Sequence, residues 1–499
     1  MYKIDWEQYL SHERLRKEND QFFSGNDFRT CFESDLRRVA FCPAIRRMHD
    51  KTQVIPLSNG DTALTRLTHS MQVMTVAEML GTCLTRRKEF TALYGEPHAT
   101  LYGDYISAIL RSASLIHDIG NPPFGHFGEK SIQNYFRRYL NSRHIITDRQ
   151  SLDFTEFDGN ALGLRIVSKL QYTGTLEGLN LTYATLGAYL KYPNKGESKP
   201  DGYVGNHKHG IFETEDDLFD KIVEKCHLRT DKGKIKRHPL AYLVEAADSI
   251  CYGVMDIEDG YNLWWYDFDT IVDGLSKYIE ESVNDKALLD KYSVMKVGSE
   301  GKIKVFSIEK LIEFERTWDA DGKIPKDRRR HILEFREKLI DYLIKVTVKV
   351  FVDNLDKINE GSFDYELLDL DEYMVSKALG AFTRQYIISR RDIQQTELTG
   401  NSVITGLLDI LLRYSFHEDK KYRSKINAVI AKSRLEELIH ENIHPNLTYN
   451  IFKEKDELWK FDIEKLSPYA KLRVIVDFIA SMTDKYSVEL YQKFAGMRM

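Results

Sequence analysis

Apolar residues recur along much of this chain at intervals of three and four positions, the spacing that lines one face of an α-helix. The clearest stretches predict these helices: Thr62–Leu84, Tyr105–Ile116, a segment capped by Phe157–Asn160 that runs to about Leu170, Thr182–Leu190 and Pro239–Glu258. From Arg328 onward one helical pattern follows another, with interruptions expected near Gly361, Gly400 and Pro445. The pattern therefore predicts an all-α protein.

A few segments depart from this pattern. Gln53–Leu57 is expected to be extended, and residues 194–210 are rich in glycine, lysine, histidine and asparagine, which suggests a long loop or a lid. Residues 292–309 favour a small β-hairpin insertion. We find no internal repeat, low-complexity segment or obvious linker. One compact helical body with insertions is the simplest interpretation. Within it we expect a helical core over residues 1–270 and a helical C-terminal region over residues 271–499 packed on that core.

Composition agrees with this picture. The chain has 499 residues, enough for one large core or two or three ordinary ones. Only 11 of them are prolines, which suits long helices. The formal net charge is −5, so no overall basic field indicates a nucleic-acid partner. Local basic runs such as Arg328–Arg330 could contact phosphates, although most runs of this kind are solvated surfaces.

Cysteine usage and the N-terminus indicate the compartment. The five cysteines are scattered and none forms a CxxC spacing, which is typical of free thiols in a reducing cytosol. The N-terminus has no apolar signal region, and no uncharged apolar run is long enough to span a bilayer. We expect a cytoplasmic protein with no membrane segment.

An adjacent imidazole and carboxylate stand where one helix ends. His117 and Asp118 follow the helix Tyr105–Ile116, Gly120 breaks that helix, and Pro122-Pro123 prevents its immediate resumption. Neighbouring side chains on a helix point about 100° apart, so this pair can share one ion only near a helix end. The ion must also recruit distant ligands. Imidazole together with carboxylate suits Mn, Fe, Ni, Co or Mg better than a thiolate-preferring ion.

A second pair of ionisable groups follows within a few residues. Another amphipathic helix is expected to begin near Phe124–Gly128, and His126 and Glu129, three residues apart, then share one face. A packed core gains nothing from such a cluster, because each buried charge needs a partner. The two pairs therefore indicate a functional site.

Further candidates lie elsewhere in the chain. A single histidine within a helix, such as His69, is more often a core residue than a ligand, but Arg66 one turn earlier adds a cation suited to a phosphate. On the helix Pro239–Glu258, Asp248, Tyr252 and Asp256 follow one another at intervals of four. They form a polar stripe that is either a solvent-facing surface or part of the site. Exposed faces are usually richer in lysine and glutamate.

The order of these residues, H…HD…D, resembles that of the HD-domain phosphohydrolases. More closely, the chain resembles the bacterial deoxyguanosine triphosphate triphosphohydrolase family. The segments that carry this resemblance occur in the family's order: Arg46–Val54, Thr65–Ser70, His117–Glu129, Phe157–Ala161, Lys191–Pro193, Asp248–Asp259 and Asp477–Asp484. Asn121 stands where some animal relatives have a histidine, which favours the bacterial subgroup.

The resemblance implies an HD-domain helical core with additional C-terminal helices. It also implies metal-dependent hydrolysis of a deoxynucleoside triphosphate, with dGTP the first substrate to test, to the deoxynucleoside and tripolyphosphate. Matched position by position, the implied metal ligands are His69, His117, Asp118 and Asp248. The implied catalytic pair is His126 and Glu129. An imidazole oriented by a carboxylate can protonate the leaving 5′ oxygen or accept a proton from water, and the sequence does not decide between them.

The same resemblance implies two further groups of residues. The positions that match or approach triphosphate contacts are Arg66, Lys191, Tyr192 and Lys208, of which Lys208 lies in a divergent loop. The positions that match sugar-reading residues are Gln53, Tyr252 and Asp256. A tyrosine ring under C2′ would reject a ribose hydroxyl, although Tyr252 could instead be a core aromatic residue. Glu397 is a candidate for reading guanine, but a surface glutamate is the more common situation.

The resemblance also implies a homo-oligomer, commonly a hexamer. Some members of the family need a dNTP effector or bind single-stranded DNA, so both are possible partners. Two other functions stay open at this stage. One is an HD-domain phosphohydrolase acting on nucleoside monophosphates, cyclic nucleotides or (p)ppGpp. The other is a nucleic-acid-binding or dNTP-sensing protein in which catalysis is secondary.

Overall fold

The computed structural model describes residues 4–16, 30–53, 64–171, 178–196, 203–284, 328–371, 374–430 and 462–497. Within these ranges the chain is built almost entirely from helices, and extended pairing is limited to isolated bridges such as that between Thr52 and Thr65. The prediction of an all-α protein is therefore confirmed.

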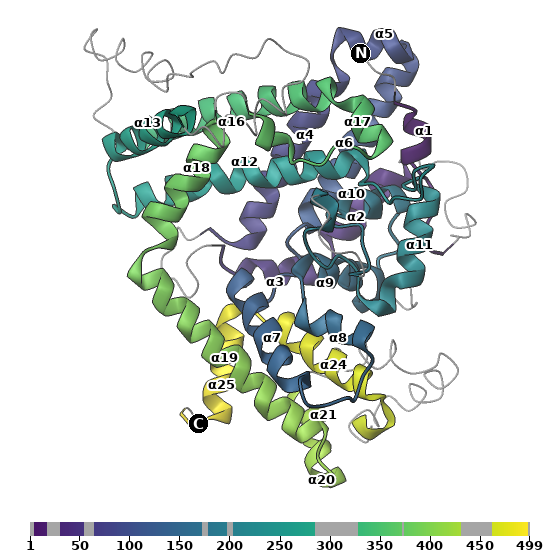
Figure 1. Cartoon of the computed structure of the whole chain (residues 1–499), viewed down its shortest axis with the longest axis vertical. Coiled ribbons are helices and arrows are strands. Elements are labelled where there is room, and N and C mark those ends of the chain that lie inside the picture. Colours follow the sequence, from purple (N-terminus) through teal and green to yellow (C-terminus); the bar gives the residue numbers. More distant parts are fainter. Residues whose placement is uncertain are drawn as a thin grey trace.

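One layer of packed helices contains the elements predicted from the apolar spacing. Helix α4 packs against α6 and α12, α2 and α10 cover α6, and α16 lies on α12 and α4 (Figure 1). Their bounds are α2 (Cys31–Ala40), α4 (Arg66–Thr85), α6 (Glu96–Ile116), α10 (Tyr183–Tyr189), α12 (Pro239–Asn262) and α16 (Arg328–Asp353). The predicted helices are present, but α6 begins nine residues earlier and α12 ends four residues later than expected.

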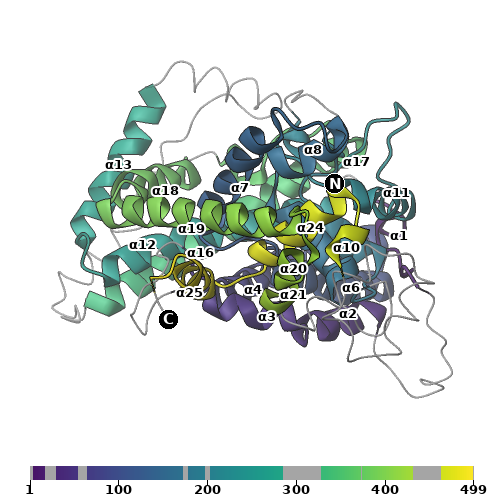
Figure 2. The same ribbon diagram turned by 90° about the horizontal axis from the view of Figure 1, so that it is seen from below.

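A second group of helices brings the end of the chain beside its middle. The long helix α19 (Arg391–Ser415) packs against α7 (Gly125–Leu140), α24 (Pro468–Ala480) and α25 (Asp484–Phe494). Figures 1 and 2 show α7, α24 and α25 lying alongside α19. The helix that carries His126 and Glu129 is thus packed against elements more than 250 residues further along the chain.

The other described α-helices are shorter or flank these two groups. They are α1 (Trp6–Tyr9), α3 (Pro43–Arg47), α5 (Lys88–Tyr94), α8 (Asp148–Thr155), α9 (Gly159–Arg165), α11 (Asp216–Lys225), α13 (Phe268–Asn284), α17 (Leu355–Glu360), α18 (Val375–Thr383), α20 (Lys420–Arg423) and α21 (Lys425–Val429). Helix α9 continues as a π-helical turn to Leu170, and α18 continues as another to Ile388.

The glycines that were expected to interrupt helices have different roles. Gly361 ends α17 with a left-handed φ of +71°, as predicted. Gly400 lies inside the continuous helix α19, so the break predicted there is wrong. A Cβ at Gly400 would lie only 2.7 Å from Cγ of Phe124, so this glycine accommodates an aromatic ring from another element.

Some expectations fall outside the described residues. These are the extended segment beyond Gln53, the hairpin at 292–309, the interruption at Pro445 and the middle of the loop 194–210. The division at residue 270 stays a prediction. Helices α16 and α18, which follow that residue, pack directly on α12. Among the described helices, none combines the length and apolar character that a bilayer crossing requires.

A buried ionic network joins the end of the chain to the core. Asp477 of α24 accepts hydrogen bonds from Arg165 Nε at 2.8 Å and from Arg473 Nη2 at 2.8 Å, and Arg165 also pairs with Glu215. All four side chains are fully buried. Charges that are removed from water require such partners, so the network fixes α24 against α9.

We expect Asp477→Ala to destabilise the protein strongly, because two buried arginines would lose their shared carboxylate. Removing one partner of a buried pair costs about 3–5 kcal/mol. Urea unfolding followed by tryptophan fluorescence measures the loss. Glu156→Ala is the control, since its ion pair with Arg137 is about half exposed and worth less than about 1 kcal/mol. Equal losses in both variants would contradict the structural role of the network.

Candidate active site

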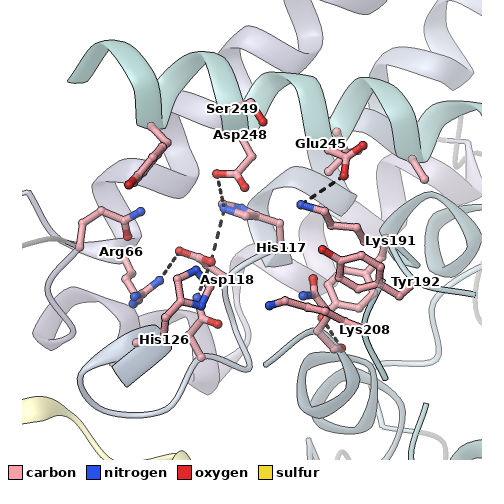
Figure 3. A pocket seen from close by; sticks show the side chains of 18 of the residues that line it. Arg66, His117, Asp118, His126, Lys191, Tyr192, Lys208, Glu245, Asp248 and Ser249 are labelled. Carbon is pink, nitrogen blue, oxygen red and sulfur yellow. Dashed lines mark hydrogen bonds and ion pairs between the residues drawn. The ribbon is translucent and has the colours of Figure 1, made fainter. Parts of the chain in front are cut away.

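A cavity of about 460 Å³ opens between α12, the α6–α7 turn and the segment that follows α10 (Figure 3). Side chains from the N-terminal two-thirds of the chain form most of its wall, and Ile388 and Ile393 complete it from the C-terminal region. The sequence-predicted residues that line it are Gln53, Arg66, His117, Asp118, His126, Lys191, Tyr192, Lys208, Asp248 and Tyr252. Residues predicted from scattered segments are therefore brought together around one cavity.

Two imidazoles and two carboxylates form one cluster at the wall of this cavity. Asp248 Oδ1 lies 3.0 Å from His69 Nε2 and 3.4 Å from His117 Nε2. Ligand atoms of His69, His117 and Asp118 all lie within 4.8 Å of one another. His69 is completely buried behind the cavity wall, so the cluster extends from the surface of the cavity into the protein.

Local hydrogen bonds orient this cluster. His117 Nδ1 donates to the carbonyl oxygen of Ser114 at 2.7 Å, one turn earlier in α6, which leaves Nε2 directed at the two carboxylates. Burial lowers the pKa of His117, but Asp118 and Asp248 outweigh that effect and raise it to about 9. Burial likewise acts to raise the pKa of Asp248, and the charge of His117 holds it well below its usual value. The cluster therefore favours a positive charge between its members.

These residues fit a divalent metal ion. An imidazole whose Nδ1 donates to a backbone carbonyl offers its Nε2 lone pair, which is the usual arrangement of a metal-ligating histidine. Two imidazoles and two carboxylates form a donor set suited to Mn, Fe, Co, Ni or Mg. His69 Nδ1 is buried and has no hydrogen-bond partner among the described residues.

Asp118 is held by two donors besides the cluster. Arg66 Nη1 donates to Oδ2 at 2.6 Å, and Asn121 Nδ2 donates to Oδ1 at 2.6 Å. Burial acts to raise the pKa of Asp118, but the guanidinium of Arg66 lowers it. The carboxylate is therefore ionised and fixed in orientation at the cavity wall.

Glycines allow this close packing around the α6–α7 turn. Gly125 has φ +56°, and a Cβ there would lie 2.4 Å from Nη2 of Arg66. A Cβ at Gly159, the first residue of α9, would lie 2.3 Å from Oδ1 of Asn121 and 2.8 Å from Oε1 of Glu129. Both positions need glycine because polar side chains occupy the space that a side chain would fill.

His126 and Glu129 form a hydrogen-bonded pair on the first turn of α7. His126 Nδ1 lies 2.8 Å from Oε2 of Glu129, and Oε1 accepts the backbone N–H of Gly159 at 2.7 Å. Burial acts to raise the pKa of Glu129, but the hydrogen bond from His126 and the charge of Lys208 lower it. The His126 side chain is 72% exposed, whereas the Glu129 side chain is buried. A fixed anion therefore orients an accessible ring.

Cations gather on the opposite side of the cavity. Lys191 Nζ pairs with Glu245 at 3.3 Å, and Arg237 holds the same carboxylate with both of its terminal nitrogens. Lys208 Nζ pairs with Asp158 at 2.9 Å. All three cations lie within 6.0 Å of the ring centre of Tyr192. Figure 3 shows Lys191, Tyr192 and Lys208 on the side of the cavity opposite Arg66 and Asp118.

The polar stripe predicted on α12 is only partly exposed. Asp248 and Tyr252 line the cavity, whereas Asp256 is buried and does not. Neither oxygen of Asp256 has a hydrogen-bond partner among the described residues, and burial raises its pKa well above the usual value. Gln53 faces the same region with an amide oxygen that lacks a described partner. The stripe is therefore not a solvent-facing surface along its whole length.

Sequence reasoning missed several residues around the cavity. Glu245 was not singled out, although its spacing before Asp248 on the same helix was a possible signal. Phe124 and Phe127 line the wall near His126, and Ile388 and Ile393 lie on elements whose apolar residues resemble ordinary core positions. Glu397, the candidate for reading a base, does not line the cavity.

Comparison with known proteins identifies relatives over the full length of the chain. Residues 449–493 match the phosphohydrolase-associated domain. A deoxyguanosinetriphosphate triphosphohydrolase-like protein of Listeria innocua is 32% identical over 99% of this chain and 100% of its own length. Proteins named deoxyguanosinetriphosphate triphosphohydrolase from Cronobacter sakazakii and Klebsiella pneumoniae are 28% and 29% identical, with complete coverage of both chains.

The chain belongs to the deoxyguanosinetriphosphate triphosphohydrolase-like family. This confirms the family resemblance and the prediction that the protein is an enzyme, a hydrolase. The phosphohydrolase-associated match falls on the C-terminal segment that contains α24 and α25, the helices packed along α19. Membership thus covers both groups of helices.

We expect Gly125→Ala to destabilise this family member more than a substitution at an open glycine. A left-handed conformation costs an L-residue about 1–2 kcal/mol, and here the new Cβ would also collide with Arg66. Gly233→Ala is the control, because Gly233 has φ +80° but nothing within 4 Å of the added carbon. Thermal unfolding compares them, and equal shifts in Tm would show that Arg66 gives way without cost.

Proposed function

We propose that this enzyme hydrolyses a deoxynucleoside triphosphate, with dGTP as the first substrate to test, to the deoxynucleoside and tripolyphosphate. The observation that supports this most is the arrangement of three groups around one cavity. A histidine–carboxylate cluster, the His126–Glu129 pair and a set of cations all face the same space. Full-length relatives named for this activity agree with the proposal.

A divalent metal ion is part of the proposal. His69, His117, Asp118 and Asp248 would hold it, since their donor atoms converge beside the cavity. Such an ion would polarise a phosphate oxygen and offset its charge during attack by water. Mn, Mg, Co, Ni and Fe all suit this donor set.

His126 is the proposed proton-transfer group. Its Nδ1 donates to the buried carboxylate of Glu129, so its other nitrogen can exchange a proton with the reacting phosphate ester. The ring can protonate the leaving 5′ oxygen or accept a proton from the attacking water. Glu129 is itself anchored by the Gly159 amide, and it therefore holds the ring in a fixed orientation.

The triphosphate would lie along the cationic side of the cavity. Lys191 and Lys208 supply positive charge there beside the ring of Tyr192, and Arg66 adds a cation from the facing side of the cavity, next to Asp118. Charge that develops on phosphate oxygens is stabilised by such preorganised cations. Lys191 and Arg66 already pair with carboxylates, which keeps their side chains in place before a ligand arrives.

The deoxyribose would contact Tyr252, with Gln53 as a hydrogen-bonding partner. The family resemblance also assigns Asp256 to the sugar, although its side chain does not line the cavity in this structure. Tyr252 is 37% exposed and lies one turn from Asp248 on α12, so its ring can close against the sugar where a 2′ hydroxyl would clash. Gln53 and Asp256 have polar atoms that lack partners among the described residues. From the family resemblance we also propose a cytoplasmic homo-oligomer, commonly a hexamer, with a possible dNTP effector and possible single-stranded DNA binding.

We expect purified enzyme with Mn or Mg to convert dGTP to deoxyguanosine and tripolyphosphate, as separated by ion-exchange chromatography. Each dNTP, GTP and pairs of dNTPs should be assayed in parallel, and EDTA should abolish turnover because the proposed ion is removed. Orthophosphate or pyrophosphate as the product would contradict the proposal and favour another HD-domain phosphohydrolase. Turnover only with dNTP pairs would indicate an effector site.

We expect His126→Ala to lower kcat by about 10²–10⁴-fold, because the proposed proton transfer loses its group. Glu129→Gln should lower kcat less, since the ring stays but its orienting charge is lost. His144→Ala, at an exposed position, is the control and should retain full activity. Steady-state kinetics on dGTP provide the measurement. A fully active His126→Ala variant would rule out the assigned role.

A further inference from the structure

Asp484, the first residue of α25, joins two segments of the active site. Its Oδ1 accepts the backbone N–H of Phe124 at 3.0 Å. Its Oδ2 accepts both the backbone N–H and the hydroxyl of Thr52, at 3.0 and 2.8 Å. The side chain is buried, and its carboxylate makes these bonds across more than 350 residues of sequence. One carboxylate therefore connects the turn before His126 to the segment that contains Thr52 and Gln53.

Phe124 has a backbone conformation that needs such support. Its φ is +63°, in the left-handed region that residues with a side chain rarely adopt. This conformation turns the chain from the loop after α6 into α7, and it sets where His126 begins to project. Strained residues persist only where the surroundings over-determine them.

The C-terminal region supplies two further contacts to the same turn. Gly400 of α19 lies against the Phe124 ring, with no room for a Cβ between them. Lys51 donates to the carbonyl oxygen of Asn121 at 2.5 Å and to that of Ala480, the last residue of α24, at 3.0 Å. Contacts from α19, α24 and α25 thus converge on residues 121–124.

We propose that Asp484 is a positioning residue for the reaction. It fixes the turn before His126 and the segment that contains Gln53 in a defined position relative to each other. The inference rests on the proposed function, in which His126 transfers a proton and Gln53 contacts the sugar. Asp484 itself does not line the cavity, so it acts only through the two backbone segments that it holds. This gives the phosphohydrolase-associated segment a specific part in catalysis.

The test compares Asp484→Ala and Asp484→Asn with wild type for kcat, KM and the preference for dGTP over GTP. A small misplacement of catalytic groups can cost about 10²-fold, so kcat of Asp484→Ala should fall by about tenfold or more. Its preference for dGTP should fall as well, because Gln53 is released. Asn offers one acceptor oxygen for two segments, so it should lie between wild type and Ala.

Asp35→Asn is the matched control. Asp35 is also buried and accepts the backbone N–H and the hydroxyl of a threonine, Thr182, but it joins α2 to α10 away from both segments. A merely structural defect lowers the active fraction and therefore kcat, and it leaves KM and the dGTP preference unchanged. If Asp484→Ala behaves in that way, or like wild type, the proposal is overturned.

A second pair of variants tests the turn without touching the carboxylate. Gly400→Ala would push the Phe124 ring, whereas Gly406→Ala adds the same group to the same helix against the ring of Tyr491, 2.2 Å from its Cε2. Only Gly400→Ala should lower kcat and the dGTP preference. Equal kinetic effects in both variants would show that α19 packing, rather than the turn, is what matters.

Hydrogen–deuterium exchange separates this proposal from the proposed function. In Asp484→Ala, peptides that cover Thr52–Gln53 and Phe124–Gly125 should exchange faster than in wild type, and in Asp35→Asn they should not. If wild type fails to release tripolyphosphate, the proposed function is wrong. Faster exchange at both segments in Asp484→Ala would still show that Asp484 holds both of them. Unchanged exchange at both overturns it.

Discussion

The turn between α6 and α7 depends on glycines, because side-chain atoms lie where a Cβ would otherwise be. Arg66 crosses the position that a Cβ of residue 125 would occupy, and Asn121 and Glu129 press against Gly159. These approaches place two different carboxylates, Asp118 and Glu129, on either side of one short loop. Asp118 lies beside His117, and Glu129 pairs with His126. The separation of the proposed metal-binding cluster from the proposed proton-transferring pair depends on this turn.

Charge balance is the second constraint on the cavity. Buried carboxylates are costly unless cations or donors satisfy them, and here every one at the cavity wall has such a partner. Glu245 illustrates the principle, because Arg237 and Lys191 share it and are thereby held in place. Asp256 is the contrast: it is buried, and its oxygens have no partner among the described residues. Burial correspondingly raises the pKa of this carboxyl group well above its usual value.

Local pattern predicted much of this architecture, and long-range packing explains the rest. The apolar spacing indicated α4, α10 and α12, and the three-residue interval between His126 and Glu129 predicted their pairing on one face. Gly400 could not be interpreted correctly from the sequence, because the ring that requires a glycine there belongs to Phe124, 276 positions earlier. A glycine that breaks a helix gives the same signal in the sequence. The segment Asp477–Asp484 carried the family resemblance, but the bonds from Asp484 to Thr52 and Phe124 have no local signal in the sequence. Ile388 and Ile393 were beyond reach for a similar reason. Nothing in their neighbourhood distinguishes them from ordinary core or capping residues.

The position of Asp484 in the chain has a consequence for how the protein is made. Synthesis proceeds from the N-terminus, so all four proposed metal ligands and the His126–Glu129 pair leave the ribosome well before α25 does. Domains begin to fold while the chain is still growing. The backbone N–H of Phe124 then lacks its acceptor, Asp484, until α25 has been translated. A chain synthesised only as far as α24 would thus carry every proposed ligand without Asp484, and under our proposal full activity would require the synthesis of α25.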